Sequence, residues 1–157
     1  MTRATNPLRQ WTAYTLCALT LASCTGRDHP LEEGEYRFTT EAILADGCGL
    51  SGAEPFTWTG RLQANGNFVR LTYDPLAIRL EGSYRESSDT FAADGTRGPV
   101  SVTLGGQNCD VEFAGLSLQG ITDSETEFHG TVLVRYDTDG SDRCFCETRS
   151  TYRASRL

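Results

Sequence analysis

The chain is poor in the residues on which common enzyme motifs depend. Its 157 residues include no lysine, one methionine and two histidines. It contains no Gly-x-Ser-x-Gly elbow, His-Glu-x-x-His helix, phosphate-binding loop or dinucleotide fingerprint. A Ser-His-Asp triad would have to use His29 or His129, and neither lies in a suggestive setting. We therefore expect no enzyme and no cofactor; a hydrolase that works through two carboxylates stays open as a third alternative.

Positive charge is also scarce. All 14 basic side chains are arginine and face 21 acidic residues, so the net charge is -7. Such a field repels a phosphate backbone, and we expect no nucleic-acid partner. The length and the 38% hydrophobic content fit a single packed domain.

The first residues have the pattern of an export signal. Arg3 and Arg9 form a basic start, and an apolar stretch covers residues 11–21. This stretch is within the usual ~7–15 residues of a signal peptide and short of the ~20 that span a bilayer. It ends in Leu21-Ala22-Ser23-Cys24.

These four residues resemble the lipobox of bacterial lipoprotein precursors. The resemblance implies cleavage before Cys24, a lipid thioether on its sulfur and acylation, including palmitate, of the new amine. Residues 1–23 are then the signal peptide, and the membrane is a partner through the lipid anchor. Thr25 is not the aspartate that retains enteric lipoproteins in the inner membrane. We therefore expect the cell envelope, and the outer membrane where there are two.

Removal of the leader leaves 134 residues with a net charge of about -9. Residues 24–34 have the polar, Pro- and Gly-containing composition of a tether. We assign residues 35–157 to a single domain. Its charge disfavours contact with anionic lipid headgroups, so the domain should stand off the membrane.

From residue 35 onward the apolar pattern alternates with a period of two. Asn65-Gly66 between two such runs is a strong hairpin signal. The pattern predicts an all-β, antiparallel up-and-down meander of about eight strands that closes into a barrel, with a β-sandwich as the alternative. The expected strands are 36–46, 55–64, 67–73, 76–85, 99–105, 109–119, 127–137 and 143–154.

The cysteines support the count of eight. Without Cys17 and Cys24, four remain, an even number that fits two disulfides in an exported domain. Eight strands place Cys48, Cys109, Cys144 and Cys146 at one rim, whereas an extra strand over residues 86–93 would separate them. A Cys144–Cys146 bond would be strained by its short span. We therefore expect one of this pair to bond Cys48 and the other Cys109.

The domain shows a weak resemblance to the lipocalins. Gly34-x-Tyr36 stands where lipocalins carry Gly-x-Trp, and Arg153 stands near the chain's end as their packing arginine does. The resemblance implies a cavity for a small apolar ligand. Inward-facing glycines could leave space beside aromatic rings; alternatively, they ease strand coiling in a filled barrel. The candidate cavity residues are Phe38, Trp58, Gly60, Gly82, Phe113 and Gly130.

The sequence contains two candidate metal sites, and neither is favoured. Asp137, Asp139 and Asp142 surround Gly140 as in a calcium loop, but the EF-hand spacing does not fit and a plain turn explains them. The four cysteines with His129 could bind zinc, but Cys-x-Cys is not the ribbon spacing. We expect a binding or interaction module, for a small apolar ligand or an envelope protein. The alternative is a structural envelope lipoprotein without a ligand.

Overall fold

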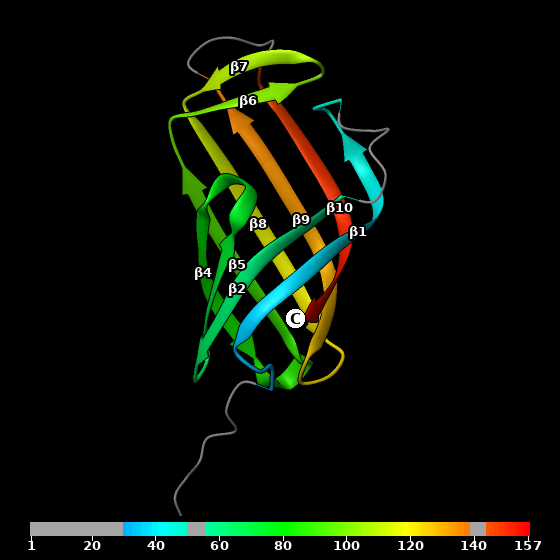
Figure 1. Cartoon of the computed structure of the whole chain (residues 1–157). Helices are drawn as coiled ribbons and strands as arrows, with labels where there is room; N and C mark the ends of the chain where they lie inside the picture. The colour runs from blue at the N-terminus through cyan, green and yellow to red at the C-terminus, as the bar shows by residue number, and fades with distance from the viewer. Residues whose placement is uncertain (1–29, 50–55, 139–143) are drawn as a thin grey trace, which may run out of the picture.

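The computed structural model describes residues 30–49, 56–138 and 144–157 (Figure 1). Its elements, in chain order, are β1 (Gly34–Asp46), β2 (Thr57–Asn65), β3 (Phe68–Tyr73), the 3-10 helix η1 (Asp74–Leu76), β4 (Ile78–Arg85), the 3-10 helix η2 (Glu86–Ser88), β5 (Thr90–Arg97), β6 (Val100–Leu104), β7 (Gln107–Val111), β8 (Phe113–Thr122), β9 (Glu127–Asp137) and β10 (Cys146–Arg156).

Eight of these strands form a closed antiparallel barrel. Its order is β1-β10-β9-β8-β5-β4-β3-β2, and the last strand pairs with the first from Tyr36↔Arg156 to Asp46↔Thr148. The predicted fold class and strand number are therefore confirmed. Because β1 pairs with both β10 and β2, the sheet has no open edge in the lower part of the barrel as drawn in Figure 1.

The membership of the barrel differs from the prediction. The segment 86–93, which was left out as a strand, contains η2 and the first half of β5, and β5 pairs with β4 and β8. The predicted strand 99–105 is instead β6, which pairs only with β7 in a separate hairpin. The predicted strand 109–119 is divided at Glu112 between β7 and β8.

These two errors cancel in the direction of the chain. β5 adds one strand to the barrel and the predicted strand 99–105 is removed from it. The number of barrel strands before β8 is therefore unchanged, and β8 starts at the same end as predicted. Figure 1 shows this hairpin lying across one end of the barrel, which we call the capped end. Val100, Val102 and Leu104 alternate as barrel residues do, but they pack on the barrel's end. Alternation alone does not distinguish the two arrangements.

The hairpin between β2 and β3 was predicted one residue too early. Asn65 pairs with Phe68, so Gly66 and Asn67 form the two-residue turn. Gly66 has a φ of 56°, the left-handed conformation that such a turn requires.

The end opposite the hairpin, which we call the acidic end, is closed by apolar side chains. Leu31 is buried there, and the Glu32 backbone N–H donates to the Glu125 carbonyl at 2.7 Å. The Tyr36 hydroxyl donates to the Glu32 carbonyl at 2.7 Å. Residues 31–34, assigned by composition to the tether, therefore belong to the barrel domain.

The arginine beside Gly34 is also not the one expected. Arg156 pairs in register with Tyr36, and its guanidinium lies against Gly34 and forms an ion pair with Glu32. Arg153 instead bonds Glu41 on the outer wall, at 3.1 Å. The alternation of side chains along the strand explains the difference, because Arg153 and Arg156 are three positions apart and therefore lie on opposite faces.

Candidate functional site

The aromatic residues predicted to border a cavity instead pack against one another and against further rings. The rings of Phe38 and Trp58 are stacked, with centroids 3.5 Å apart. Phe38 also contacts Phe128 and Tyr152, with centroids 5.6 Å and 5.5 Å away. The barrel interior toward the acidic end is therefore packed with rings.

The three predicted cavity glycines lie where strands approach closely. A Cβ placed on Gly82 would lie 1.8 Å from the Ala92 carbonyl oxygen, and one on Gly130 would lie 1.8 Å from that of Gln119. A Cβ on Gly60 would lie 2.2 Å from the Thr72 carbonyl oxygen. These positions are occupied by neighbouring backbone, so the geometry fits the coiling interpretation rather than an empty volume beside each glycine.

Phe113 was predicted to face inward, and that is wrong. Its side chain is exposed on the outer wall, because the chain restarts a strand at β8 after the hairpin and this shifts the alternation. It borders an outer groove of about 410 Å³ together with Leu133, Arg135 and Asp137. A second groove, of about 420 Å³, contains Gly130 and Ile121. The predicted residues are thus divided among the core and two surface grooves.

The interior toward the capped end has a different character. Tyr73 ends β3, Tyr136 lies near the end of β9, and Ser150 lies on β10; all three are buried but keep 7%, 8% and 6% of their surface accessible. By contrast, Tyr36, Phe38, Phe128 and Tyr152 are fully buried at 0%. Tyr73, Tyr136 and Ser150 thus keep more accessible surface than these four, although Tyr84, toward the acidic end, also keeps 5%.

The hydroxyl groups show the same division. Tyr152 donates to the Gln119 carbonyl at 3.0 Å, and Tyr84 donates to the Asp89 carboxylate at 2.8 Å. For Tyr73, Tyr136 and Ser150 the structure records no side-chain hydrogen bond to any residue that it describes. The one fully buried polar side-chain atom without a partner in the described ranges is Thr122 Oγ1. The other three hydroxyls thus border accessible space, since a sealed and unbonded hydroxyl would be costly.

Tyr73 and Tyr136 come from opposite walls. In the barrel order, β9 and β3 are separated by three strands on either side. Burial nevertheless raises the pKa of Tyr73 well above its usual value, and the proximity of Tyr136 raises that pKa further. Burial likewise raises the pKa of Tyr136. Both phenols are therefore neutral hydrogen-bond donors at physiological pH.

The surroundings of this pair are apolar. The Trp58 ring meets the Tyr73 ring edge to face, with centroids 4.7 Å apart. Val132 and Val134 are inward-facing on β9, and none of the Asp, Glu, Arg and His residues that the structure describes is buried. Charged residues also occur at this end: Asp74 and Asp137 directly follow the two tyrosines in the chain, and the half-buried Asp46 carboxylate accepts a hydrogen bond from Thr148 at 3.2 Å. We call the set Trp58, Tyr73, Tyr136 and Ser150 the tyrosine site.

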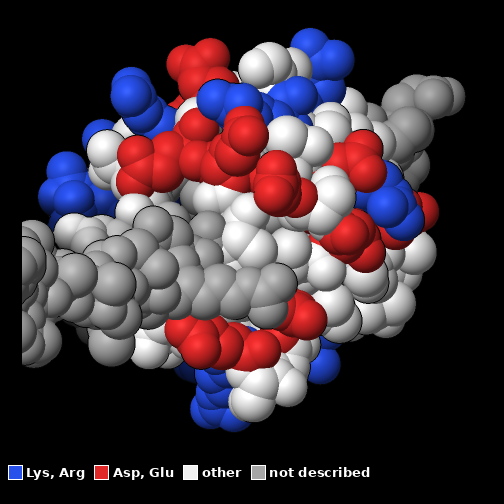
Figure 2. Space-filling model, turned by 90° about the horizontal axis from the view of Figure 1, so that it is seen from below, with Lys and Arg blue, Asp and Glu red and all other residues white. Residues whose placement is uncertain are grey.

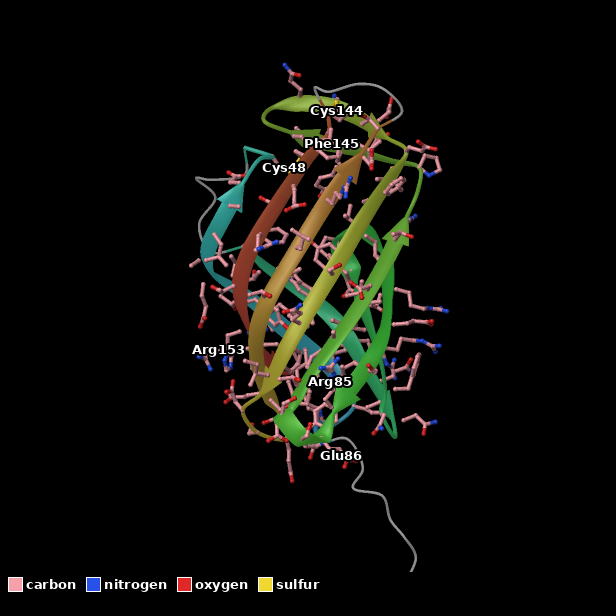
Figure 3. All side chains as sticks on the ribbon, turned by 180° about the vertical axis from the view of Figure 1, so that it is seen from behind. Cys48, Arg85, Glu86, Cys144, Phe145 and Arg153 are labelled. Carbon is pink, nitrogen blue, oxygen red and sulfur yellow. A yellow bond between two sulfur atoms is a disulfide. The ribbon has the colours of Figure 1, made fainter. Side chains whose placement is uncertain are left out.

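The cap over this end is held by the predicted disulfides. Cys48 is bonded to Cys146 and Cys109 to Cys144, so each member of the Cys144/Cys146 pair bonds outward as expected. Figure 3 labels Cys48 and Cys144 beside the hairpin, at the opposite end from Glu86. Cys109 belongs to the hairpin strand β7 rather than to a barrel strand, so its bond fastens the cap.

The other candidate site residues do not come together. His129 lies on the outer wall of β9, where its Nδ1 is 2.8 Å from the Asp123 carboxylate. Asp137 is 3.5 Å from the Arg135 guanidinium, and Asp139 and Asp142 lie outside the described residues, as do Cys24 and His29. Within the described ranges no group of three metal-ligating side chains occurs.

Comparisons of the chain with family models, curated proteins and solved structures find no significant match. In the part of the chain that the structure describes, no helix has the length and apolar character needed to cross a bilayer. Of the tyrosine site, the sequence analysis named Trp58 and missed Tyr73, Tyr136 and Ser150, although all four occupy inward positions of the alternating pattern. An examination of the inward-facing residues at the strand ends nearest the cysteines would have identified Tyr73 and Tyr136.

Proposed function

We propose that the protein is a lipid-anchored binding module of the cell envelope that takes up a small, mainly apolar ligand at the tyrosine site. The observation that carries this proposal is the contrast inside one barrel. The half toward the acidic end is packed with aromatic rings, whereas three hydroxyl-bearing residues toward the capped end keep 6–8% of their surface accessible and have no side-chain hydrogen bond to a described residue. Apolar walls with a few convergent polar groups are the usual composition of a small-molecule site.

The lipid anchor determines which end of the barrel faces the membrane. Anchored at Cys24, the chain has six residues before Pro30, a reach of ~20 Å when extended. The described chain begins at the acidic end, where Figure 2 shows acidic side chains spread over the face. Basic side chains lie among them, and Arg156 and Arg153 form ion pairs with Glu32 and Asp123. This end therefore faces the membrane, held off from anionic headgroups, and the capped end points away from it.

Native mass spectrometry of the protein purified from its own envelope tests the proposal. We expect a fraction with an added mass of a few hundred daltons that disappears on organic extraction and is restored by the extract. A single mass equal to the lipidated chain, in protein that also fails to bind any added apolar probe, would favour a structural envelope lipoprotein without a ligand.

A further inference from the structure

We propose that a groove on the outer wall of the barrel is a docking site for a basic segment of a partner protein, and that a large apolar side chain of this segment is seated against Phe113 and Leu133. The groove has a volume of about 410 Å³ and is lined by residues of β5, β8, β9 and β10; we call it the Phe113 groove. Figure 3 views this wall of the barrel and labels Phe145 near the cap. The proposal goes beyond the small-ligand function and concerns a different surface.

The floor of the groove is opened by Gly115. This residue pairs with Thr96 on β5 and with Arg135 on β9, and a Cβ placed on it would have no neighbour nearer than 3.8 Å. Every other glycine among the described residues has either a positive φ or an atom closer than 3.0 Å to that position. Backbone geometry therefore does not require a glycine here. Because glycine weakens a strand, what it contributes at this position is the depression in the wall.

The sides of the depression are apolar. Phe113 lies two positions before Gly115 on the same face of β8 and is 37% exposed. Leu133 pairs with Ser117, the next outward residue of β8, and is partly exposed. An aromatic or aliphatic side chain that enters between Phe113 and Leu133 is removed from water on both sides.

The rim of the groove is acidic. Its lining contains three carboxylates, from Asp94, Asp137 and Glu147, and one guanidinium, from Arg135. The guanidinium lies 3.5 Å from the Asp137 carboxylate and over the Phe145 ring, 5.2 Å from its centroid, so its charge is already paired. For the carboxylates of Asp94 and Glu147 the structure records no ion pair with any residue that it describes. The lining therefore keeps a net charge of -2 that a cationic group can neutralise.

A second groove on the barrel surface shows that this charge is particular to the first. The groove that contains Ile121 has a similar volume of about 420 Å³, and its lining has one charged side chain, Arg85, with no carboxylate. The net charge of -7 on the whole chain also favours the approach of a basic partner. Charge complementarity thus favours a basic segment with an apolar anchor at the Phe113 groove.

Amide NMR titrations of the mature protein in phosphatidylcholine nanodiscs test the proposal with three capped pentapeptides. They are Gly-Lys-Phe-Lys-Gly, the charge-reversed Gly-Glu-Phe-Glu-Gly, and Gly-Lys-Gly-Lys-Gly, which lacks the apolar anchor. We expect saturable binding of the first, with the largest shifts at residues 94–96, 113–117 and 133–137. The other two peptides should bind at least tenfold more weakly. Added salt should weaken the binding of the first, because the carboxylates at the rim are solvent-exposed.

Two variants change the groove and leave the buried core unchanged. Gly115→Leu places a side chain in the space of the apolar anchor and should weaken binding of the Lys-Phe-Lys peptide at least tenfold. Asp94→Asn/Glu147→Gln should weaken it about two- to tenfold, the effect of two exposed ion pairs. The matched controls are Ile121→Ala in the second groove and Glu86→Gln, which removes one negative charge at the opposite end of the barrel (Figure 3). Both controls should bind as wild type, and the amide spectrum of each variant reports whether it is folded.

The proposal is overturned by equal binding of the charge-reversed peptide, by wild-type affinity in the folded groove variants, by shifts confined to other residues, or by no saturable binding at millimolar peptide. Shifts at the same residues with a neutral oligosaccharide, and none with the Lys-Phe-Lys peptide, would overturn it in favour of a saccharide site. None of these results bears on the tyrosine site, which lies inside the barrel.

Discussion

The two disulfides should differ in what their removal costs. The Cys48–Cys146 bond joins residues 98 positions apart, and the Cys109–Cys144 bond joins residues 35 apart and lies within the larger loop. Taken singly, the chain-entropy model assigns them about 4.7 and about 3.8 kcal/mol at 25 °C. Their loops overlap, so each bond shortens the loop that the other closes.

With the other bond kept, the effective loop of Cys48–Cys146 falls to about 64 residues and its removal should cost about 4.3 kcal/mol. Removal of Cys109–Cys144 should then cost about 3.4 kcal/mol. For a domain of this length, the first loss lowers the midpoint of thermal unfolding by about 15 °C. The variants are the paired substitutions Cys48→Ala/Cys146→Ala and Cys109→Ala/Cys144→Ala.

Urea unfolding followed by Trp58 emission measures both losses. We also expect a difference in location: without Cys109–Cys144, amide exchange should rise mainly in β6 and β7, because that bond fastens a hairpin that pairs with no barrel strand. Without Cys48–Cys146, protection should fall throughout the barrel. A larger loss from the shorter loop, or a loss below 1 kcal/mol for the longer one, would refute the entropic reasoning.

Three further outcomes are expected. Gly130→Ala should destabilise the fold by about 3 kcal/mol, since its Cβ meets the Gln119 carbonyl oxygen, whereas Gly115→Ala, with nothing nearer than 3.8 Å, should lie within about 0.5 kcal/mol of wild type in the same urea assay. Burial raises the pKa of Tyr36 to about 12, so stability should be flat below pH 10 and fall from pH 10 to 12, where only the unfolded chain ionises; a tyrosinate absorbance that rises before unfolding would contradict this. Cys24→Ser should abolish labelling by a fatty-acid analogue and leave unprocessed precursor, and equal labelling of both proteins would exclude the lipoprotein assignment.

Local patterns were enough to predict the architecture. Alternation with a period of two is a property of the extended chain itself, so the strands around Phe38, Trp58 and Phe128 could be recognised before any contact was known. The number of strands between cysteines also led to the pairing of Cys48 and Cys109 with the Cys144/Cys146 pair, as the structure has them, because the two errors around β5 and β6 cancel.

Tertiary structure decided which alternating segments belong to the barrel. The residues of β5 and those of β6 alternate alike, and only pairing with β4 and β8 places the first in the wall and leaves the second in the cap. It also decided where the interior is filled. A glycine in a strand leaves room or lets a neighbouring strand approach, and the barrel's coiling selects the second at Gly82 and Gly130. The tyrosine site likewise depends on closure, because only a closed barrel places Tyr73 and Tyr136, 63 residues apart in the chain, on opposite walls of one lumen.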